Sequence, residues 1–513
     1  MPVTLTFGAF ATTMLFFTIA FPLSSLSAYM LLRHWVRWCP AAFTGGLLYG
    51  FSPYLTAQGL GHLNLVFVPL PPLIFLVLCH ITSPQRRRSW AWGAALAMLC
   101  TAQFFISSEV LASTAIIGGT GLLAAAAVNP VAARDRWKFT ASAIGSASVI
   151  MIFLLSYPLW LLAAGPDRTS GPAQETDLYR GNLLAPVIPD SSMHFRFAEF
   201  LRLADTFSGN TSENGLYIGI PLLVALIAGV IACRRRPIMK VVALTTAAAF
   251  ILALGSRLTV ARYVWKAVPL PEAALTRIPF LNNTIAARYS LYVMLGAALI
   301  LALTLQALRD RIYTRDHRSA LAAGIACSAL ACLALVPLIP AWPYTAHVTQ
   351  APRYFSSNAA EAIPNNSVGV TYPFPTSADP IPMLWQVAAS LRFKSPGGRF
   401  VIPAPGSAGT PPSDQQTLIG QIFIKLYSGH RSTLTPALRS ALLAELRSWN
   451  VRAVLVQPAG ERPALVMPFF EWLLGRQPDV RAGGISAWYG QVETAAAPGF
   501  PRGAGALYCT SST

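Results

Sequence analysis

Long apolar runs separated by short polar turns dominate the first two thirds of the chain. Most are long enough to cross the roughly 30 Å hydrocarbon core of a bilayer as a helix. Pro and Gly interrupt several of them, which membrane helices tolerate when neighbouring helices satisfy the freed backbone groups. The pattern predicts ten membrane helices, near residues 5–32, 40–56, 64–80, 89–105, 108–128, 139–164, 216–233, 241–256, 286–308 and 319–341.

Basic residues follow alternate runs, the first, third, fifth, seventh and ninth. Short loops rich in Lys and Arg are retained in the cytoplasm, so these turns predict one cytoplasmic face. The longer segments 165–215, 257–285 and 342–513 then lie outside. The basic residues in question are Arg33, Arg37, Arg86, Arg87, Arg88, Arg134, Arg136, Lys138, Arg234, Arg235, Arg236, Lys240, Arg309, Arg311, Arg315 and Arg318.

The composition agrees with a lipid environment. Hydrophobic residues make up 54% of the 513 and charged residues only 11%, against about 25% charged in a typical soluble domain. The net charge of +18 would suit a nucleic-acid partner, but most of it falls in the alternate turns. Nucleic acid is therefore excluded, and we expect a multi-pass membrane protein.

The start of the chain is unusual for this topology, which places it outside. Residues 5–32 are too long, and wrongly flanked, for a cleaved signal peptide. We therefore expect that a helix and an outer loop precede Met1 in the complete protein.

The chain divides into a membrane domain, 1–341, and an extracytoplasmic α/β domain, 342–513. In the second domain, strand patterns near 367–374, 451–458 and 484–490 alternate with helical ones, including a helix that opens at the N-cap Thr435. Outer loop 165–215 carries a short amphipathic helix in "HFRFAEFLRLADTF". Outer loop 257–285 is interrupted by Pro and is typical of re-entrant or interfacial pieces.

Several chemistries have no motif in this sequence. Six of the seven Cys lie in or beside apolar runs, and no Cys/His spacing suggests zinc or haem. There is no GxxxxGK[ST] phosphate loop and no GxSxG elbow. No protein ligand set for a metal is predicted.

Three polar residues stand at the outer ends of predicted helices. His62 and Asn64, in "GLGHLN", mark the turn between two runs and are candidate substrate-binding residues; the alternative is that His62 caps a helix or bonds across helices. Glu109 is the first acid of the chain. Burial of a carboxylate at that depth costs free energy unless the group is paired with a cation or hydrated. Glu109 is therefore either a catalytic group or a structural partner of Arg or His.

The outer loops supply four further candidates. Asp177 is a candidate catalytic acid and Glu213 a candidate substrate-binding one, with solvated loop positions as the alternative. Arg288 opens the ninth run in "NNTIAARY", where it could grip a phosphate or snorkel to lipid headgroups. Arg257 is a second candidate cation for a phosphate.

Three stretches resemble the bacterial, actinobacterial-like GT-C-type membrane glycosyltransferases. They are "LSAYMLLRHWVRWCPAAFTGGLLYGFSPYLTAQGLGHLNLVFVPLPPLIFLVL", "GNTSENGLYIGIPLLVALI" and "VPLPEAALTRIPFLNNTIAARYSLYVML". The resemblance spans roughly residues 20–310. It implies a GT-C-like fold and transfer of a sugar, with inversion, from a polyprenyl-phosphate donor to a glycan, lipid or protein acceptor on the outer face. Metal use varies in such enzymes, so a divalent cation stays open.

The sequence departs from that family at the expected catalytic acid. Such enzymes carry a carboxylate in the first outer loop, whereas residues 1–108 contain no Asp or Glu. A preceding segment holds that acid, or Glu109, Asp177 or Glu213 replaces it, or the chain is not catalytic. Two other functions therefore stay open: a non-catalytic protein of envelope assembly, and a transporter or flippase of a lipid-linked saccharide.

Overall fold

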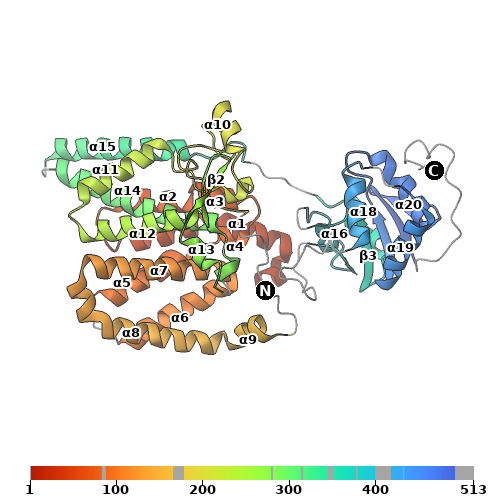
Figure 1. Ribbon diagram of the computed structural model, residues 1–513, viewed down its shortest axis with the longest axis horizontal. Coiled ribbons are helices and arrows are strands. Elements are labelled where there is room, and N and C mark those ends of the chain that lie inside the picture. Colours follow the sequence, from red (N-terminus) through yellow and green to blue (C-terminus); the bar gives the residue numbers. More distant parts are fainter. Residues whose placement is uncertain are drawn as a thin grey trace. The chain divides into compact units, whose positions relative to one another are not determined.

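The computed structural model describes residues 2–83, 88–165, 178–278, 281–313, 316–344, 350–376, 379–398, 417–430 and 433–490. These residues form two compact units that divide between Tyr344 and Gln350. The first is almost entirely helical and the second is built on a mixed sheet (Figure 1).

The first unit has helices at all ten of the predicted runs. Seven described helices are long and apolar enough to cross a membrane, whereas α2, α11 and α12 have 12, 14 and 17 residues. The main helices are α1 (Pro2–Leu32), α2 (Cys39–Gly50), α5 (Leu70–Thr82), α6 (Ser89–Ile106), α7 (Ser108–Val128), α8 (Pro130–Leu154), α11 (Ile220–Cys233), α12 (Pro237–Ala253), α14 (Ser290–Ile312) and α15 (His317–Leu335).

Shorter elements connect these helices. They are α3 (Pro53–Gln58), α4 (Leu63–Val66), α9 (Ser156–Ala164), α10 (Ala198–Ala204), η1 (Thr211–Glu213), β1 (Arg257–Val260), β2 (Tyr263–Pro269), α13 (Glu272–Leu275), η2 (Leu281–Asn283), η3 (Ala286–Tyr289) and η4 (Val336–Leu338). Helix α10 confirms the short helix predicted in the loop 165–215.

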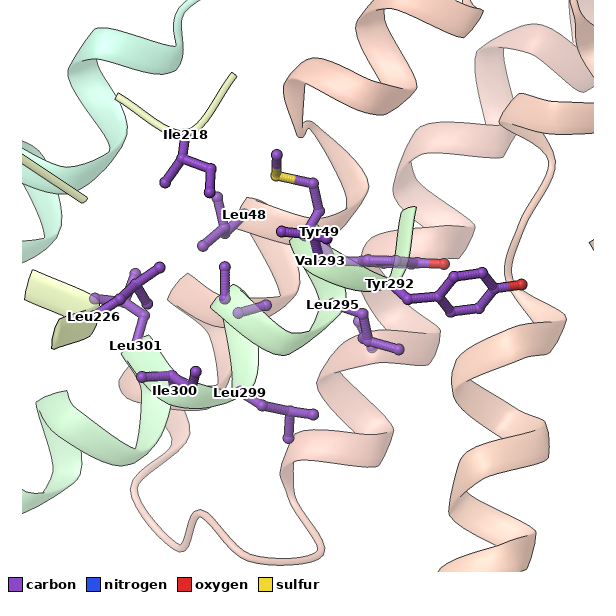
Figure 2. Packing of buried hydrophobic residues seen from close by; sticks show 14 of the residues in the cluster. Leu48, Tyr49, Ile218, Leu226, Tyr292, Val293, Leu295, Leu299, Ile300 and Leu301 are labelled. Atoms are coloured by element: carbon purple, nitrogen blue, oxygen red, sulfur yellow. The ribbon is translucent and has the colours of Figure 1, made fainter. Parts of the chain in front are cut away.

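Helix α14 is the centre of the first unit. Its apolar window is 78% buried, against 11–44% for the other six candidate spans. Figure 2 shows its side chains together with Leu48 and Tyr49 of α2 and Leu226 of α11. A Cβ at Gly296 would lie 1.9 Å from Thr246 Oγ1 of α12, so glycine at this position lets two helices approach closely, as is usual in membrane bundles.

The segment 257–285 differs from the expected re-entrant or interfacial pieces. Strands β1 and β2 form an antiparallel hairpin, with Thr259 opposite Val264 and Val260 opposite Tyr263. The β-branched and aromatic residues of "RLTVARYVW" favour strands, and the charges among them masked that signal. The hairpin turn places Ala261 at φ 51°, where the Asn182 side chain bonds both its N–H and its carbonyl.

The second unit is an α/β fold around a five-stranded sheet in the order β4-β3-β5-β7-β6. Strand β3 runs parallel to β4 and β5, and β7 is antiparallel to β5 and β6. Its elements are η5 (Arg353–Ser356), η6 (Asn358–Ala362), β3 (Ser367–Tyr372), α16 (Met383–Ala388), β4 (Phe393–Lys394), α18 (Leu418–Tyr427), α19 (Pro436–Ser448), β5 (Val451–Val456), η7 (Pro463–Leu465), α20 (Val466–Leu474), β6 (Val480–Ala482) and β7 (Ile485–Tyr489).

The predicted N-cap of α19 is confirmed. The Thr435 side chain accepts a hydrogen bond from Leu438 N at 3.1 Å. Leu442, Leu443 and Leu446 of this helix are buried in the core of the second unit, beside β3 and β5.

Candidate functional site

Four short segments of the first unit converge at one place, although they are far apart in the sequence. Helix α3 begins after the N-cap Ser52, whose side chain accepts from Leu55 N. The 3-10 turn η1 packs on α3, because a Cβ at Gly215 would lie 2.6 Å from Tyr54 Cα and only glycine allows this approach. The first turn of α7 and the turn η3 complete the group.

The Arg288 guanidinium lies between two carboxylates. Its Nη2 donates to Glu213 Oε1 at 2.6 Å, and its Nε donates to Glu213 Oε2 at 3.1 Å. Its Nη1 donates to Glu109 Oε2. The side chains of Glu109, Arg288 and Glu213 are 20%, 14% and 4% exposed. The three residues form what we call the Arg288 cluster.

Two further groups fix the carboxylates. Gln58 Nε2 donates to Glu213 Oε2 at 3.0 Å, and both side chains are buried. The backbone N–H of Ile285 donates to Glu109 Oε1 at 2.8 Å. Since Ile285 precedes η3, this bond ties the segment that carries Arg288 to the first turn of α7. Each oxygen of Glu109 therefore holds one donor, whereas both oxygens of Glu213 hold two.

The guanidinium retains hydrogen-bonding capacity. Of its five N–H groups, three bond to the two carboxylates. In the described part of the chain, one N–H on each terminal nitrogen has no partner. The buried Tyr54 hydroxyl, close enough for Arg288, Glu213 and Glu109 to act on it electrostatically, likewise has no hydrogen-bond partner among the described residues.

The electrostatics of Glu213 favour its charged form. Burial alone would raise the pKa of this carboxyl, but the hydrogen bonds and charge of Arg288 outweigh it. With the Gln58 amide and the nearby His62, they hold the pKa of Glu213 below its ordinary value. A carboxylate stabilised in this way orients Arg288 and is a poor proton acceptor.

The structure brings together most of the residues that the sequence singled out. Glu109, Glu213 and Arg288 are in direct contact, and His62, half-buried before α4, acts on Glu213 by its charge. Asn64 is exposed in α4. Arg257 is exposed at the start of the hairpin, with no ion pair to any described residue. Asp177 lies outside the described residues.

Two members of the site had not been singled out from the sequence. Gln58 and Tyr54 lie in "PYLTAQ", one turn apart on α3, in a segment that was assigned to a membrane helix and its turn. The available signal was an amide and a phenol one helical turn apart, with the amide four residues before His62. Among the described residues, no group of three or more His, Cys, Asp or Glu side chains could hold a metal ion.

The chain was compared with known proteins. Residues 4–282 match the profile of a family described as Domain of unknown function (DUF6311). No curated protein matches the chain.

Among solved structures, the chain is similar to the cryo-EM structure of the arabinofuranosyltransferase AftD from Mycobacteria, with 14% identity and a TM-score of 0.47. The match covers 88% of this chain and 29% of that enzyme. A mutant of the same enzyme gives 12% identity and a TM-score of 0.45, covering 88% and 30%. The chain thus spans under a third of the length of these structures.

Proposed function

This chain belongs to the family described as Domain of unknown function (DUF6311), and we propose from its own site that it is a membrane glycosyltransferase. It moves a sugar from a polyprenyl-phosphate donor to an envelope acceptor. The Arg288 cluster is the observation that carries the proposal. At the ends of apolar helices, it joins a cation that has two N–H groups left to bind and a carboxylate that has open acceptor capacity, and the buried phenol of Tyr54 lies close to both.

The proposed reaction assigns roles to Glu109, Arg288, Glu213 and Gln58. Glu109, the more exposed carboxylate, accepts the proton of the acceptor hydroxyl. That oxygen forms a bond to the anomeric carbon, and the bond from this carbon to the phosphate oxygen breaks. The electron pair leaves with the polyprenyl phosphate, whose growing charge is stabilised by the two remaining N–H groups of Arg288. Glu213 and Gln58 are positioning residues that hold the guanidinium.

The charge balance of the cluster bears on donor binding. One guanidinium and two carboxylates sum to −1, and protonation of His62 brings the total to zero. A positive charge on His62 therefore favours the binding of a donor phosphate.

The cluster lies at the helix ends away from the basic turns. Helix α1 ends beside Arg33 and α14 ends in the turn with Arg309 and Arg311, whereas Arg288 and Glu109 stand at the opposite ends of α14 and α7. With basic turns in the cytoplasm, we propose that the cluster and the second unit are extracytoplasmic in a bacterial plasma membrane.

The first experiment reconstitutes the purified protein in lipid with polyprenyl-phosphate sugars and follows sugar release. We expect turnover from the wild type, and loss of turnover in Arg288→Ala. Arg288→Lys keeps the charge but not the bidentate fork and should also be impaired. Glu199→Gln and Arg202→Gln, on the exposed part of α10, are matched controls that should retain full turnover.

A second candidate function has one observation in its favour. Two carboxylates already neutralise Arg288, as in a purely structural ion cluster that fastens η1 and η3 to α7. A non-catalytic protein of envelope assembly would show this. Absence of turnover by the folded wild type across hexosyl and pentosyl donors, together with a lower unfolding temperature of Arg288→Ala, would favour that function and reject the transferase.

A further inference from the structure

A large apolar cavity lies between the helices of the first unit, and no residue of the Arg288 cluster lines it. It has a volume of about 730 Å³ and is lined from α1, α5, α7, α8, α12 and α14. This volume is within the range of about 300–1,000 Å³ found for small-molecule sites. Its walls are mostly hydrocarbon, with Phe75, Leu122, Ile144, Val242 and Leu299 among them.

On α7 and α8 the lining of the cavity is about as long as one leaflet of a bilayer is deep. On α7 its lining runs from Ile117 to Asn129, and on α8 from Ala132 to Ile144. At 1.5 Å per residue each stretch covers about 18 Å, slightly more than half of a hydrocarbon core of about 30 Å. An acyl chain of one leaflet fits this depth.

The two ends of the cavity differ in polarity. At the deep end the Tyr292 hydroxyl, visible in Figure 2, is already bonded to Ser113 Oγ at 2.8 Å and Thr114 Oγ1 at 2.9 Å. At the other end stand Arg136, Trp137 and the Ser83 carbonyl. A ligand with a charged head and an apolar body therefore fits with its head at Arg136.

Arg136 is suited to an anionic headgroup. Its Nη1 donates to Ser83 O at 2.6 Å, and its other N–H groups have no partner among the described residues. Arg134 and Lys138 lie on the same turns of α8, and Trp137 is 59% exposed, as is typical of tryptophan at headgroup depth. Basic pockets between membrane helices on the cytoplasmic side are suited to anionic lipid headgroups.

We propose that this cavity is a binding site for one anionic phospholipid of the leaflet on the side of the basic turns. The acyl chains fill the space between α7, α8, α12 and α14, and the phosphate binds Arg136. The site is separate from the proposed transfer site and does not depend on it.

The test uses the purified full-length protein in detergent, with phosphatidylglycerol or phosphatidylcholine added, and native mass spectrometry to count bound lipid. The wild type should retain one phosphatidylglycerol in preference to phosphatidylcholine. Arg136→Gln should lower that preference about fivefold, the effect of one basic residue near an anionic lipid. Arg134→Gln, an exposed position outside the lining, is the matched control and should change it less.

A second pair of variants tests whether the acyl chains of the phospholipid occupy the cavity. A Cβ at Gly121 would point across the cavity, 3.7 Å from Thr245 Oγ1, so Gly121→Leu should block both lipids. Gly119→Leu makes the same change on the same helix. Gly119 does not line the cavity, and a Cβ there would meet nothing within 4 Å. It should bind lipid like the wild type.

Three outcomes would overturn the proposal. One is equal retention of the two phospholipids by the wild type. Another is lipid binding by Gly121→Leu that equals binding by Gly119→Leu. The third is displacement of phosphatidylglycerol by an equimolar polyprenyl phosphate, which would make the cavity a site for the donor lipid instead.

Discussion

At the scale of single residues, Arg288 determines what the site can do. Three of its N–H groups bond to Glu213 and Glu109, and the bidentate contact with Glu213 fixes the plane of the guanidinium. The sequence predicted Glu109 and Arg288 as candidates from their positions at helix ends, and Glu213 as an acid of an outer loop. It did not predict their contact, because about 180 residues separate Glu109 from Arg288 and only the packed bundle brings them together.

Loss of Glu213 should destabilise the protein strongly. Glu213→Gln leaves the buried guanidinium with a single counter-charge, and removal of one partner of a buried pair typically costs about 3–5 kcal/mol. Thermal unfolding in detergent measures this loss, with Glu199→Gln as the exposed control. Equal unfolding temperatures for the two variants would show that the contact contributes nothing.

Stability should also fall in acid because of the same carboxylate. The folded-state pKa of Glu213 lies below its ordinary value, so its ionised form stabilises the protein above about pH 4.3, the pKa of an unperturbed glutamate. This stabilisation is lost as the pH falls through the lower, folded-state value. Unfolding temperatures recorded from pH 6 to pH 3 should fall more steeply for the wild type than for Glu213→Gln. Parallel curves would contradict the assignment.

Gly215 is required for the position of η1. A methyl group there would lie 2.6 Å from Tyr54 Cα, and backbone cannot move aside as a flexible side chain can. Gly215→Ala should therefore cost about 1–3 kcal/mol and impair turnover by displacing Glu213. Gly145→Ala, in α8 where a Cβ meets nothing within 4 Å, should be neutral or up to about 1 kcal/mol stabilising.

At the scale of elements, the apolar runs predicted the helices well and the loops poorly. A run of some twenty apolar residues has few alternatives to a helix in lipid, so all ten positions were correct. In the second unit, α18 was missed although Thr417 caps it and its apolar side chains repeat at helical spacing. The β1–β2 hairpin was missed because charged residues interrupt its strand pattern, and because Asn182, which bonds its turn, lies 79 residues away in the sequence.

The hairpin should depend on that asparagine. Asn182 bonds the N–H and carbonyl of Ala261 and also the N–H of Leu184, so Asn182→Ala should cost about 2 kcal/mol through lost bonds and unsatisfied groups. Ala261→Gly should be at least as stable as the wild type, because its φ of 51° favours glycine. Limited proteolysis of the hairpin reports both effects; resistance of Asn182→Ala equal to the wild type would contradict this account.

At the scale of the whole molecule, the alternate basic turns and the Arg288 cluster fall at opposite ends of the helices of the first unit. The sequence predicts which helix ends face the cytoplasm, because the basic residues stand in short turns directly beside the helices. The catalytic acid could not be placed in the same way, since no acid precedes Glu109. Our proposal assigns this role to Glu109, because it keeps acceptor capacity whereas both oxygens of Glu213 already hold two donors.

The role of Glu109 as the base of the proposed sugar transfer is tested most directly by the activity of Glu109→Gln. This variant is compared with the wild type in the same lipid and at the same amount of folded protein. We predict that kcat falls about 10²–10⁴-fold, as on loss of a general base, while donor binding changes less than threefold. A kcat within threefold of the wild type would contradict the role of Glu109 and, with it, the proposed site.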